Sequence, residues 1–195
     1  MQFELLIALV GFAFATSVTP GPNNMMLMAS GANFGLRRTV PHMLGVSLGF
    51  GAMVVVLGLG VDRIIAGSPL LSETLKWVSM AYMLWLAWKI AHAGRPSDAT
   101  ASARPMTFLQ AAAFQWVNPK AWAMALGALS AYAAGVGGAL VVGIVFALVN
   151  LPTVSIWAAM GQGLRQFLAV PGRLRVFNWT MAALLVLSML PVLTH

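Results

Sequence analysis

The chain has no cysteine and few charged side chains, and each lack excludes a class of protein. Without cysteine there is no disulfide, no thiolate metal ligand and no thiol nucleophile. Charged residues make up 8% of the 195 residues and hydrophobic residues 60%, whereas a soluble domain carries about 25% charged residues. The composition therefore predicts an all-α integral membrane protein, with a single transmembrane domain over residues 1–195.

Acidic side chains are also rare. The chain has four, and none lies in the middle of an apolar segment: Glu4, Asp62, Glu73 and Asp98. The sequence has no Ser/His/acid set within such a segment, no His-x-x-x-His pair and no phosphate-binding glycine loop. We therefore expect a protein that is not an enzyme, that holds no metal and that needs no cofactor.

The apolar segments accommodate about six spans of about 20 residues each. We predict these spans at about Leu5–Ala29, Pro41–Gly60, Leu70–Ala91, Thr107–Ala131, Ala139–Met160 and Val176–Leu193. Two of the loops between them are predicted at Ser30–Val40 and Gly161–Arg175. Although Ala13-Phe14-Ala15 resembles a signal-peptide cleavage box, we interpret the N-terminal segment as an uncleaved first span.

Basic side chains gather on one side of the predicted spans. The net charge of +7 is compatible with nucleic-acid binding, but the basic residues lie at the ends of apolar segments, which favours anchoring at a membrane surface. Eight of them lie in the loops after spans one, three and five, and only Arg63 and Lys76 lie on the opposite side. The positive-inside rule then predicts that those three loops are cytoplasmic and that both termini lie outside.

The motif Thr19-Pro20-Gly21-Pro22-Asn23-Asn24 interrupts the first span. Its two prolines remove backbone donors and clash with the preceding turn, so a continuous helix cannot pass through. A broken helix at membrane depth persists only where it faces protein or a wet cavity. We therefore predict that this break borders a substrate site.

The fourth span has a matching break at Asn118-Pro119-Lys120. The polar stretch His92–Met106 divides the chain into halves of about 1–98 and 106–195, each with three spans, so the second half is inverted relative to the first. Broken spans at corresponding places in inverted halves are typical of a transporter's binding site. At about 1.5 Å per residue, both breaks fall inside a hydrocarbon core of about 30 Å.

The candidate substrate-binding residues are those at the two breaks: Pro20, Gly21, Pro22, Asn23, Asn24, Asn118, Pro119 and Lys120. Lys120 is the one basic residue in the middle of a predicted span, where a charge is costly and indicates function. It binds substrate, cycles protons, or snorkels to an interface as a structural residue. The three asparagines either cap the new helix ends or contact substrate, and the two roles are compatible.

Other residues have weaker patterns. Gly45 and Gly49 form a small-residue stripe where another helix can approach closely. Asn150 and Pro152 predict an interruption of the fifth span and additional site residues, with an ordinary proline kink as the alternative. We interpret His42 and Asn178 as interfacial residues near span ends.

Several motifs together resemble the LysE/RhtB family of amino-acid exporters. They are Thr19-Pro20-Gly21-Pro22-Asn23, Asn33-Phe34-Gly35-Leu36-Arg37-Arg38, Gly45-x-x-x-Gly49, Leu75-Lys76 with Ala81-Tyr82-Met83-Leu84-Trp85-Leu86, and Asn118-Pro119-Lys120-Ala121. The resemblance covers essentially the whole chain, and departs at Ser79 and Ala87, where the family often has glycine. It implies an exporter of amino acids or close derivatives in the bacterial inner membrane, driven by the proton-motive force.

From these features we expect a secondary transporter that exports a small, neutral amino acid or derivative. Lys120 and backbone N–H groups after Pro22 would hold the carboxylate, and oxygens near Pro20 and Asn118 would take the ammonium. The expected partners are this substrate, the lipid bilayer and protons as coupling ion, with no nucleic acid; a homo-oligomer is left open. The alternative function is a non-transporting helical membrane scaffold or assembly subunit.

Overall fold

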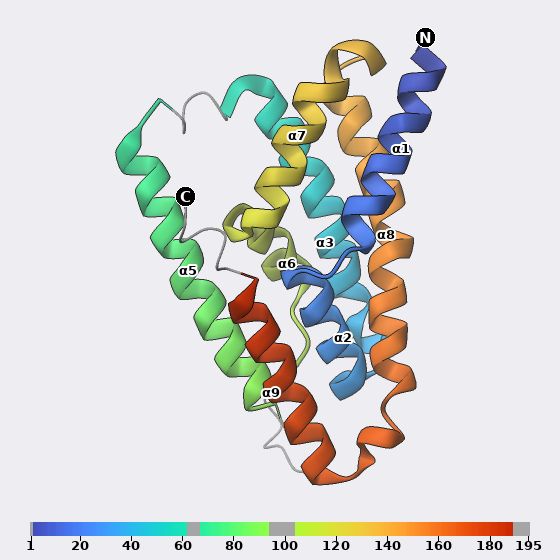
Figure 1. Cartoon of the computed structure of the whole chain (residues 1–195), viewed down its shortest axis with the longest axis vertical. Coiled ribbons are helices and arrows are strands. Elements are labelled where there is room, and N and C mark those ends of the chain that lie inside the picture. The colour runs from blue at the N-terminus through green and yellow to red at the C-terminus, as the bar shows by residue number, and fades with distance from the viewer. Residues whose placement is uncertain (1, 62–66, 94–103, 189–195) are drawn as a thin grey trace.

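The structure, a computed structural model, describes residues 2–61, 67–93 and 104–188 (Figure 1). Within these ranges every regular element is helical, as the composition predicts. The elements are α1 (Gln2–Val18), α2 (Pro22–Phe34), α3 (Leu36–Val56), the π-helical η1 (Leu57–Val61), α5 (Pro69–Ala91), α6 (Phe108–Phe114), the 3-10 turn η2 (Gln115–Val117), α7 (Pro119–Val136), α8 (Ala139–Gly163), the 3-10 turn η3 (Phe167–Ala169) and α9 (Pro171–Leu187).

Two uninterrupted helical stretches among the described residues are long and apolar enough to cross a membrane. They are Leu36–Val61 and Ala139–Gly163. A third candidate is the pair Phe3–Val18 and Pro22–Phe34, whose two helices meet at an angle of 57°. The six-span arrangement goes beyond these candidates and stays a prediction.

The break predicted in the first span is present. α1 ends at Val18, and α2 begins with Pro22 in its first turn. Proline suits that position because a helix N-terminus leaves its first N–H groups without intrahelical partners, so the missing donor costs little. The chain between the two helices is extended at Gly21, which turns one predicted span into two helices that point in different directions.

The loop predicted at Ser30–Val40 is wrong. α2 continues to Phe34 and α3 begins at Leu36, so one residue, Gly35, makes the whole turn. Its φ of 84° lies in the region that favours glycine, and its N–H donates to the Gly31 carbonyl at 2.9 Å. The two arginines that suggested a loop are compatible with the exposed first turn of α3, and the predicted start of the second span at Pro41 lies inside that helix.

The interruption predicted at Asn150 and Pro152 is absent, because α8 is continuous through both residues. A proline in a helix frees one carbonyl, and neighbouring hydroxyl groups can compensate in apolar surroundings. Here the Thr153 hydroxyl donates to the carbonyls of Val149 at 3.0 Å and Asn150 at 2.7 Å. The carbonyl that Pro152 leaves without an N–H donor is that of Leu148, four residues earlier, so the Thr153 hydroxyl bonds to neighbouring carbonyls and does not replace the lost bond.

Glycines allow the central helices to pack closely. α3 and α8 cross where Gly51 faces the backbone of Gly143, and α2 lies along α8, where Gly161 touches the backbone of Met28. Any Cβ at these positions would overlap the neighbouring chain. Beside this contact, Phe50 of α3 meets Phe146 of α8 edge to face with ring centroids 5.0 Å apart.

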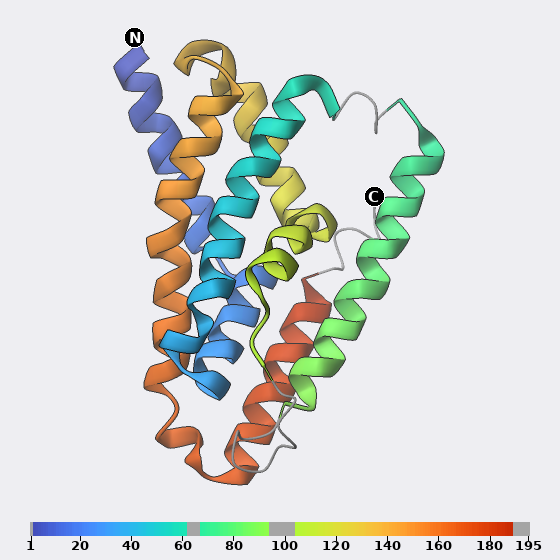
Figure 2. The same ribbon diagram turned by 180° about the vertical axis from the view of Figure 1, so that it is seen from behind.

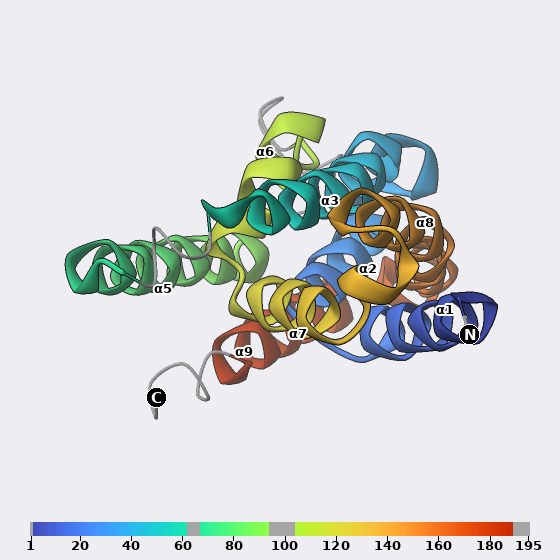
Figure 3. The same ribbon diagram turned by 90° about the horizontal axis from the view of Figure 1, so that it is seen from above.

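The remaining helices surround this centre. Figure 2 shows the segment before α6, and α6 itself, running beside α3, where Gly45 faces Phe108 and Gly49 faces Ala112. Seen from above (Figure 3), α5 extends to one side of the molecule, and it pairs with α9 through a cluster that includes Met83.

Basic residues concentrate at one end of the described bundle. The junction of α2 with α3, the end of α5 and the connection from α8 to α9 all lie at the lower end in Figure 1. Six basic residues lie at these positions: Arg37, Arg38, Lys89, Arg165, Arg173 and Arg175. Four predicted features lie wholly or partly outside the described residues: the turn at Asp62-Arg63, the loop residues Arg95 and Asp98, positions 94–103 of the divide between the halves, and the end of the sixth span.

Candidate functional site

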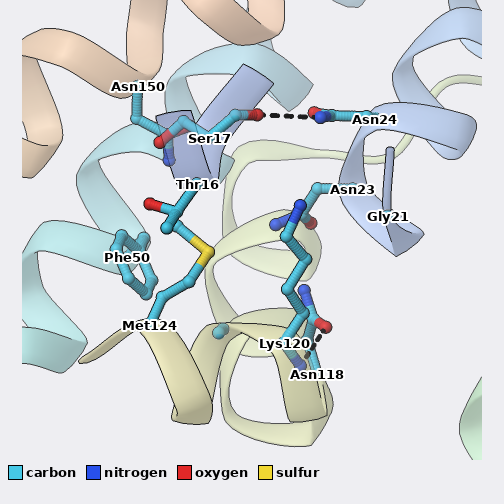
Figure 4. A pocket seen from close by; sticks show the side chains of 11 residues that line it. Thr16, Ser17, Gly21, Asn23, Asn24, Phe50, Asn118, Lys120, Met124 and Asn150 are labelled. Carbon is cyan, nitrogen blue, oxygen red and sulfur yellow. Dashed lines mark hydrogen bonds between the residues drawn. The ribbon is translucent and has the colours of Figure 1, made fainter. Parts of the chain in front are cut away.

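A pocket lies where the two helix breaks meet (Figure 4). Its cavity volume is about 20 Å³, which is room for about one water molecule. Its lining comes from α1, α2, α3, α7 and α8, so both halves of the chain contribute. The lining residues are Thr16, Ser17, Gly21, Asn23, Asn24, Phe50, Asn118, Lys120, Ala121, Met124 and Asn150.

Lys120 connects the two breaks. Its Nζ donates to the carbonyl of Thr19 at 2.7 Å, to the Thr19 hydroxyl at 2.8 Å and to the carbonyl of Pro20 at 3.3 Å. These acceptors lie just after the end of α1, where unpaired carbonyls carry partial negative charge and attract a cation. The stem of the lysine fits because Gly21 has no side chain: a Cβ there would lie 2.7 Å from Lys120 Cδ.

Asn24 supports the same helix end from α2. Its Nδ2 donates to the carbonyl of Ser17 at 2.8 Å and to that of Thr19 at 2.8 Å. The carbonyl of Thr19 therefore accepts hydrogen bonds from Asn24 and from Lys120 together. The last carbonyls of α1 accept from side chains near and far: Thr16 from the Thr19 hydroxyl at 2.8 Å, and Val18 from Trp157 Nε1 at 3.2 Å.

Asn118 is the N-cap of α7. Its Oδ1 accepts from the Lys120 N–H at 3.1 Å, and its own N–H donates to the Gln115 carbonyl at 3.3 Å. Capping is one of the two roles expected for this residue from the sequence. Because the buried side chain also lines the pocket, the geometry leaves room for the second role.

Gln115 is a residue of the site region that the sequence reasoning missed. It is fully buried and exchanges two hydrogen bonds with Asn23, one from Asn23 Nδ2 at 2.9 Å and one from Gln115 Nε2 at 3.2 Å. Gln115 Nε2 also donates to the Ala111 carbonyl at 2.8 Å. A polar amide three residues before Asn118 in an apolar span was the signal that could have found it.

At the opposite end of the pocket, the sequence reasoning found Asn150 but missed Ser17 and the apolar walls. Ser17 and Asn150 lie there, with Phe50 and Met124 as apolar walls (Figure 4). The Ser17 Oγ is buried and has no hydrogen-bond partner within the described structure, whereas the neighbouring Thr16 hydroxyl donates to the Phe12 carbonyl at 2.7 Å. The apolar walls gave no sequence signal, because phenylalanine and methionine are expected throughout a membrane helix.

The structure distributes the candidate residues as follows. Six of them line the pocket: Gly21, Asn23, Asn24, Asn118, Lys120 and Asn150. Three prolines shape the breaks beside it without lining it: Pro20, Pro22 and Pro119. Pro152 lies on the exposed side of α8, and Gly45 and Gly49 face α6.

Two residues interpreted as interfacial are buried instead. His42 is 2% exposed, with no hydrogen-bond partner for either ring nitrogen within the described structure. Asn178 is fully buried, accepts from Asn33 Nδ2 at 3.0 Å, and donates to the Ala93 carbonyl at 2.7 Å. Both were judged by distance from a span end, whereas packing against neighbouring helices decides burial.

Comparisons with family models and with curated proteins point to one family. The family model described as LysE type translocator matches residues 14–193. A protein of Klebsiella pneumoniae named "Cysteine/O-acetylserine efflux protein" is 31% identical over 194 residues, which covers 95% of this chain and 95% of that protein. The protein of the same name in Escherichia coli is 34% identical over 191 residues, covering 95% and 96%. No solved structure is significantly similar.

Proposed function

Because the chain belongs to the LysE type translocator family, we propose that it is a secondary transporter which exports a small, neutral amino acid or a derivative such as O-acetylserine. The pocket between the two helix breaks is its substrate site. The observation that carries this proposal is the position of Lys120, whose ammonium group binds the broken end of α1 from the opposite half of the chain.

The substrate carboxylate binds Lys120. A carboxylate that leaves water for a low-dielectric pocket needs a charged partner to offset its lost hydration. The lysine supplies that partner, and its present acceptors are neutral oxygens of Thr19 and Pro20. Because a charge-assisted bond to a carboxylate is stronger than a bond to a neutral oxygen, the substrate can replace them. The positive N-terminus of α2 adds to the attraction.

The substrate ammonium binds the carbonyl oxygens of Thr19 and Pro20 after Lys120 Nζ has left them. The carbonyls of Thr19 and Pro20 then face a new donor, so the zwitterion lies between Lys120 and the end of α1. Among the described residues no acidic side chain lines the pocket. A second positive charge on the substrate would therefore lack a partner, which favours neutral amino acids over cationic ones.

The transporter lies in the bacterial inner membrane as two inverted three-helix halves. The basic end of the bundle faces the cytoplasm by the positive-inside rule, and both termini face the periplasm. α1 begins at the upper end in Figure 1 and α9 rises toward that end, which supports this orientation. Alkaline phosphatase fused after residue 195 is expected to be active and a fluorescent protein fused there to be dim; the reverse pattern overturns the orientation.

Substitution of Lys120 tests the substrate site. Purified protein is reconstituted into vesicles loaded with radiolabelled O-acetylserine, and efflux is measured per amount of inserted protein. Lys120→Gln removes the charge and is expected to reduce efflux to background, whereas Lys120→Arg keeps the charge and retains part of it. The control is Lys89→Gln, which removes an exposed cation at the far end of α5 and leaves efflux unchanged.

The same variants separate substrate binding from proton cycling. Arginine cannot release a proton at working pH. If Lys120 cycles protons, Lys120→Arg loses gradient-driven export but keeps exchange of labelled for unlabelled substrate without a gradient. Wild-type efflux by Lys120→Gln rules out both roles. A wild-type protein without any substrate-dependent efflux would indicate the alternative function, a non-transporting helical scaffold.

A further inference from the structure

Ser17 lines the pocket, and its buried hydroxyl group makes no hydrogen bond within the described structure. The residue lies in the last turn of α1 and is 4% exposed. Serine and threonine inside a helix usually donate to a carbonyl one turn back. Thr16 does so, to Phe12, and Ser155 does so, to Leu151 at 2.6 Å. Ser17 is therefore an exception that lies at the pocket.

Asn150 faces the same end of the pocket from α8. The residue is 5% exposed and lines the pocket, and Figure 4 shows its side chain beside Ser17, away from the stem of Lys120. An asparagine amide offers both donors and an acceptor. This end of the pocket thus presents a hydroxyl and an amide, contributed by helices from the two halves of the chain.

The walls around these two groups are apolar. Phe50 and Met124 line the pocket on the side of Ser17 and Asn150 (Figure 4). In such surroundings a polar group that stays unpaired is costly once water is displaced. A substrate side chain that reaches this end without a hydrogen-bonding group would leave the Ser17 hydroxyl and the Asn150 amide unpaired.

We infer that Ser17 and Asn150 form a specificity subsite, which selects amino acids with a short side chain that carries a hydrogen-bonding oxygen, nitrogen or sulfur. The inference rests on the proposed substrate site, in which Lys120 and the end of α1 hold the carboxylate and ammonium groups. With those groups fixed, the side chain points toward Ser17. A site built to bond a polar group rejects the analogue that lacks it far more strongly than an apolar pocket discriminates by size.

The test compares two substrates that differ by one hydroxyl, L-serine and L-alanine. Vesicles with purified protein are loaded with both, each with its own label, and the ratio of the two efflux rates is measured. Wild type is expected to favour serine by about tenfold or more. Ser17→Ala and Asn150→Leu are each expected to bring the ratio close to one while alanine efflux persists.

Two control variants match Ser17→Ala closely. Ser47→Ala also removes a buried hydroxyl without a hydrogen-bond partner, but Ser47 does not line the pocket. Thr16→Val removes a hydroxyl from the pocket lining, but one already bonded to the Phe12 carbonyl. Both controls are expected to keep the wild-type ratio. A changed ratio in Ser47→Ala, or an unchanged ratio in Ser17→Ala and Asn150→Leu, overturns the subsite.

A binding measurement keeps this inference separate from the proposed export. Ligand that binds the folded protein raises its unfolding temperature, so the shifts caused by serine and by alanine are compared for detergent-solubilised protein. A larger shift with serine that disappears in Ser17→Ala supports the subsite even if no variant transports. Equal shifts in wild type contradict the subsite, and they do so whether or not the protein exports amino acids.

Discussion

The two helix breaks lie beside the same pocket but are stabilised in opposite ways. The break between α1 and α2 adds a remote side chain to the nearby Asn24: Lys120 binds the carbonyls of Thr19 and Pro20 from the other half of the chain. The break before α7 is closed locally, because Asn118 caps the helix with its own side chain and bonds back to Gln115. In the proposed substrate site, the first break would exchange its partners for the substrate, and the second would keep its local hydrogen bonds.

The first break is also longer than the second. Residues 19–21 separate α1 from α2, whereas one residue, Asn118, separates η2 from α7. A longer break leaves more backbone groups without helical partners, so it offers more sites to a substrate. Variants that alter each break separately can test whether the first break depends more on its backbone groups and their partners than the second does.

Restoring a continuous helix at the first break is expected to have the largest effect. In Pro20→Ala/Pro22→Ala both obstacles to a regular helix are removed, and the carbonyls that face the pocket become occupied within the helix. We expect near-normal amounts in the membrane and export at background level. Efflux per inserted protein measures this, with Pro119→Ala as the matched change at the second break, where the Asn118 cap persists. Wild-type export by the double variant would show that the first break is not needed.

The second-largest effect is expected when α2, the helix that follows the first break, is pushed away from α8. α2 is fixed to α8 where Gly161 touches the Met28 backbone, so Gly161→Leu forces these helices apart. We expect a several-fold loss of folded protein, measured by size-exclusion chromatography in detergent. Gly163→Leu is the control two residues later, because nothing lies within 4 Å of that position. Equal yields of the two variants would mean that α2 does not depend on this contact.

A smaller difference is expected between the two asparagines that stabilise the breaks. Asn24→Ala removes two hydrogen bonds, one to the buried Ser17 and one to Thr19, and is expected to cost about 2 kcal/mol of unfolding free energy. Asn118→Ala removes one cap bond and is expected to cost about 1 kcal/mol. Thermal unfolding of both variants in the same detergent measures the difference. A larger loss of unfolding free energy for Asn118→Ala would mean that the second break depends more on its asparagine than the first break does.

The sequence was sufficient for features that depend on local chemistry. Proline acts on its own helix, so the breaks at Pro20 and Pro119 could be placed from the sequence, and the helix Pro69–Ala91 was predicted within one residue. The turn at Gly35 could not be predicted in the same way. It is completed by Gln162, which accepts from the Leu36 N–H and lies 126 residues away.

The arrangement of the pocket depended in the same way on distant partners. Gln115 pairs with Asn23 over 92 residues of sequence, and the free hydroxyl of Ser17 can be recognised only once the partners of its neighbours are known. The continuity of α8 through Pro152 was not predicted either, because a proline inside a helix can kink the helix or be accommodated in it. Residue types indicated the region of the site, and tertiary contacts determined which groups remain available.

The carbonyl of Thr19 has a further consequence for conformational equilibrium. A carbonyl oxygen has two lone pairs, and here Asn24 and Lys120 occupy both. A ligand ammonium can reach this oxygen only when one donor leaves, and the departure of Lys120 removes bonds that connect the two halves. Substrate would thus have a higher affinity for the state in which Lys120 is released from the first break, and a ligand shifts a population only by such a difference in affinity. Occupancy of one oxygen atom would then couple binding to the relative motion of the halves.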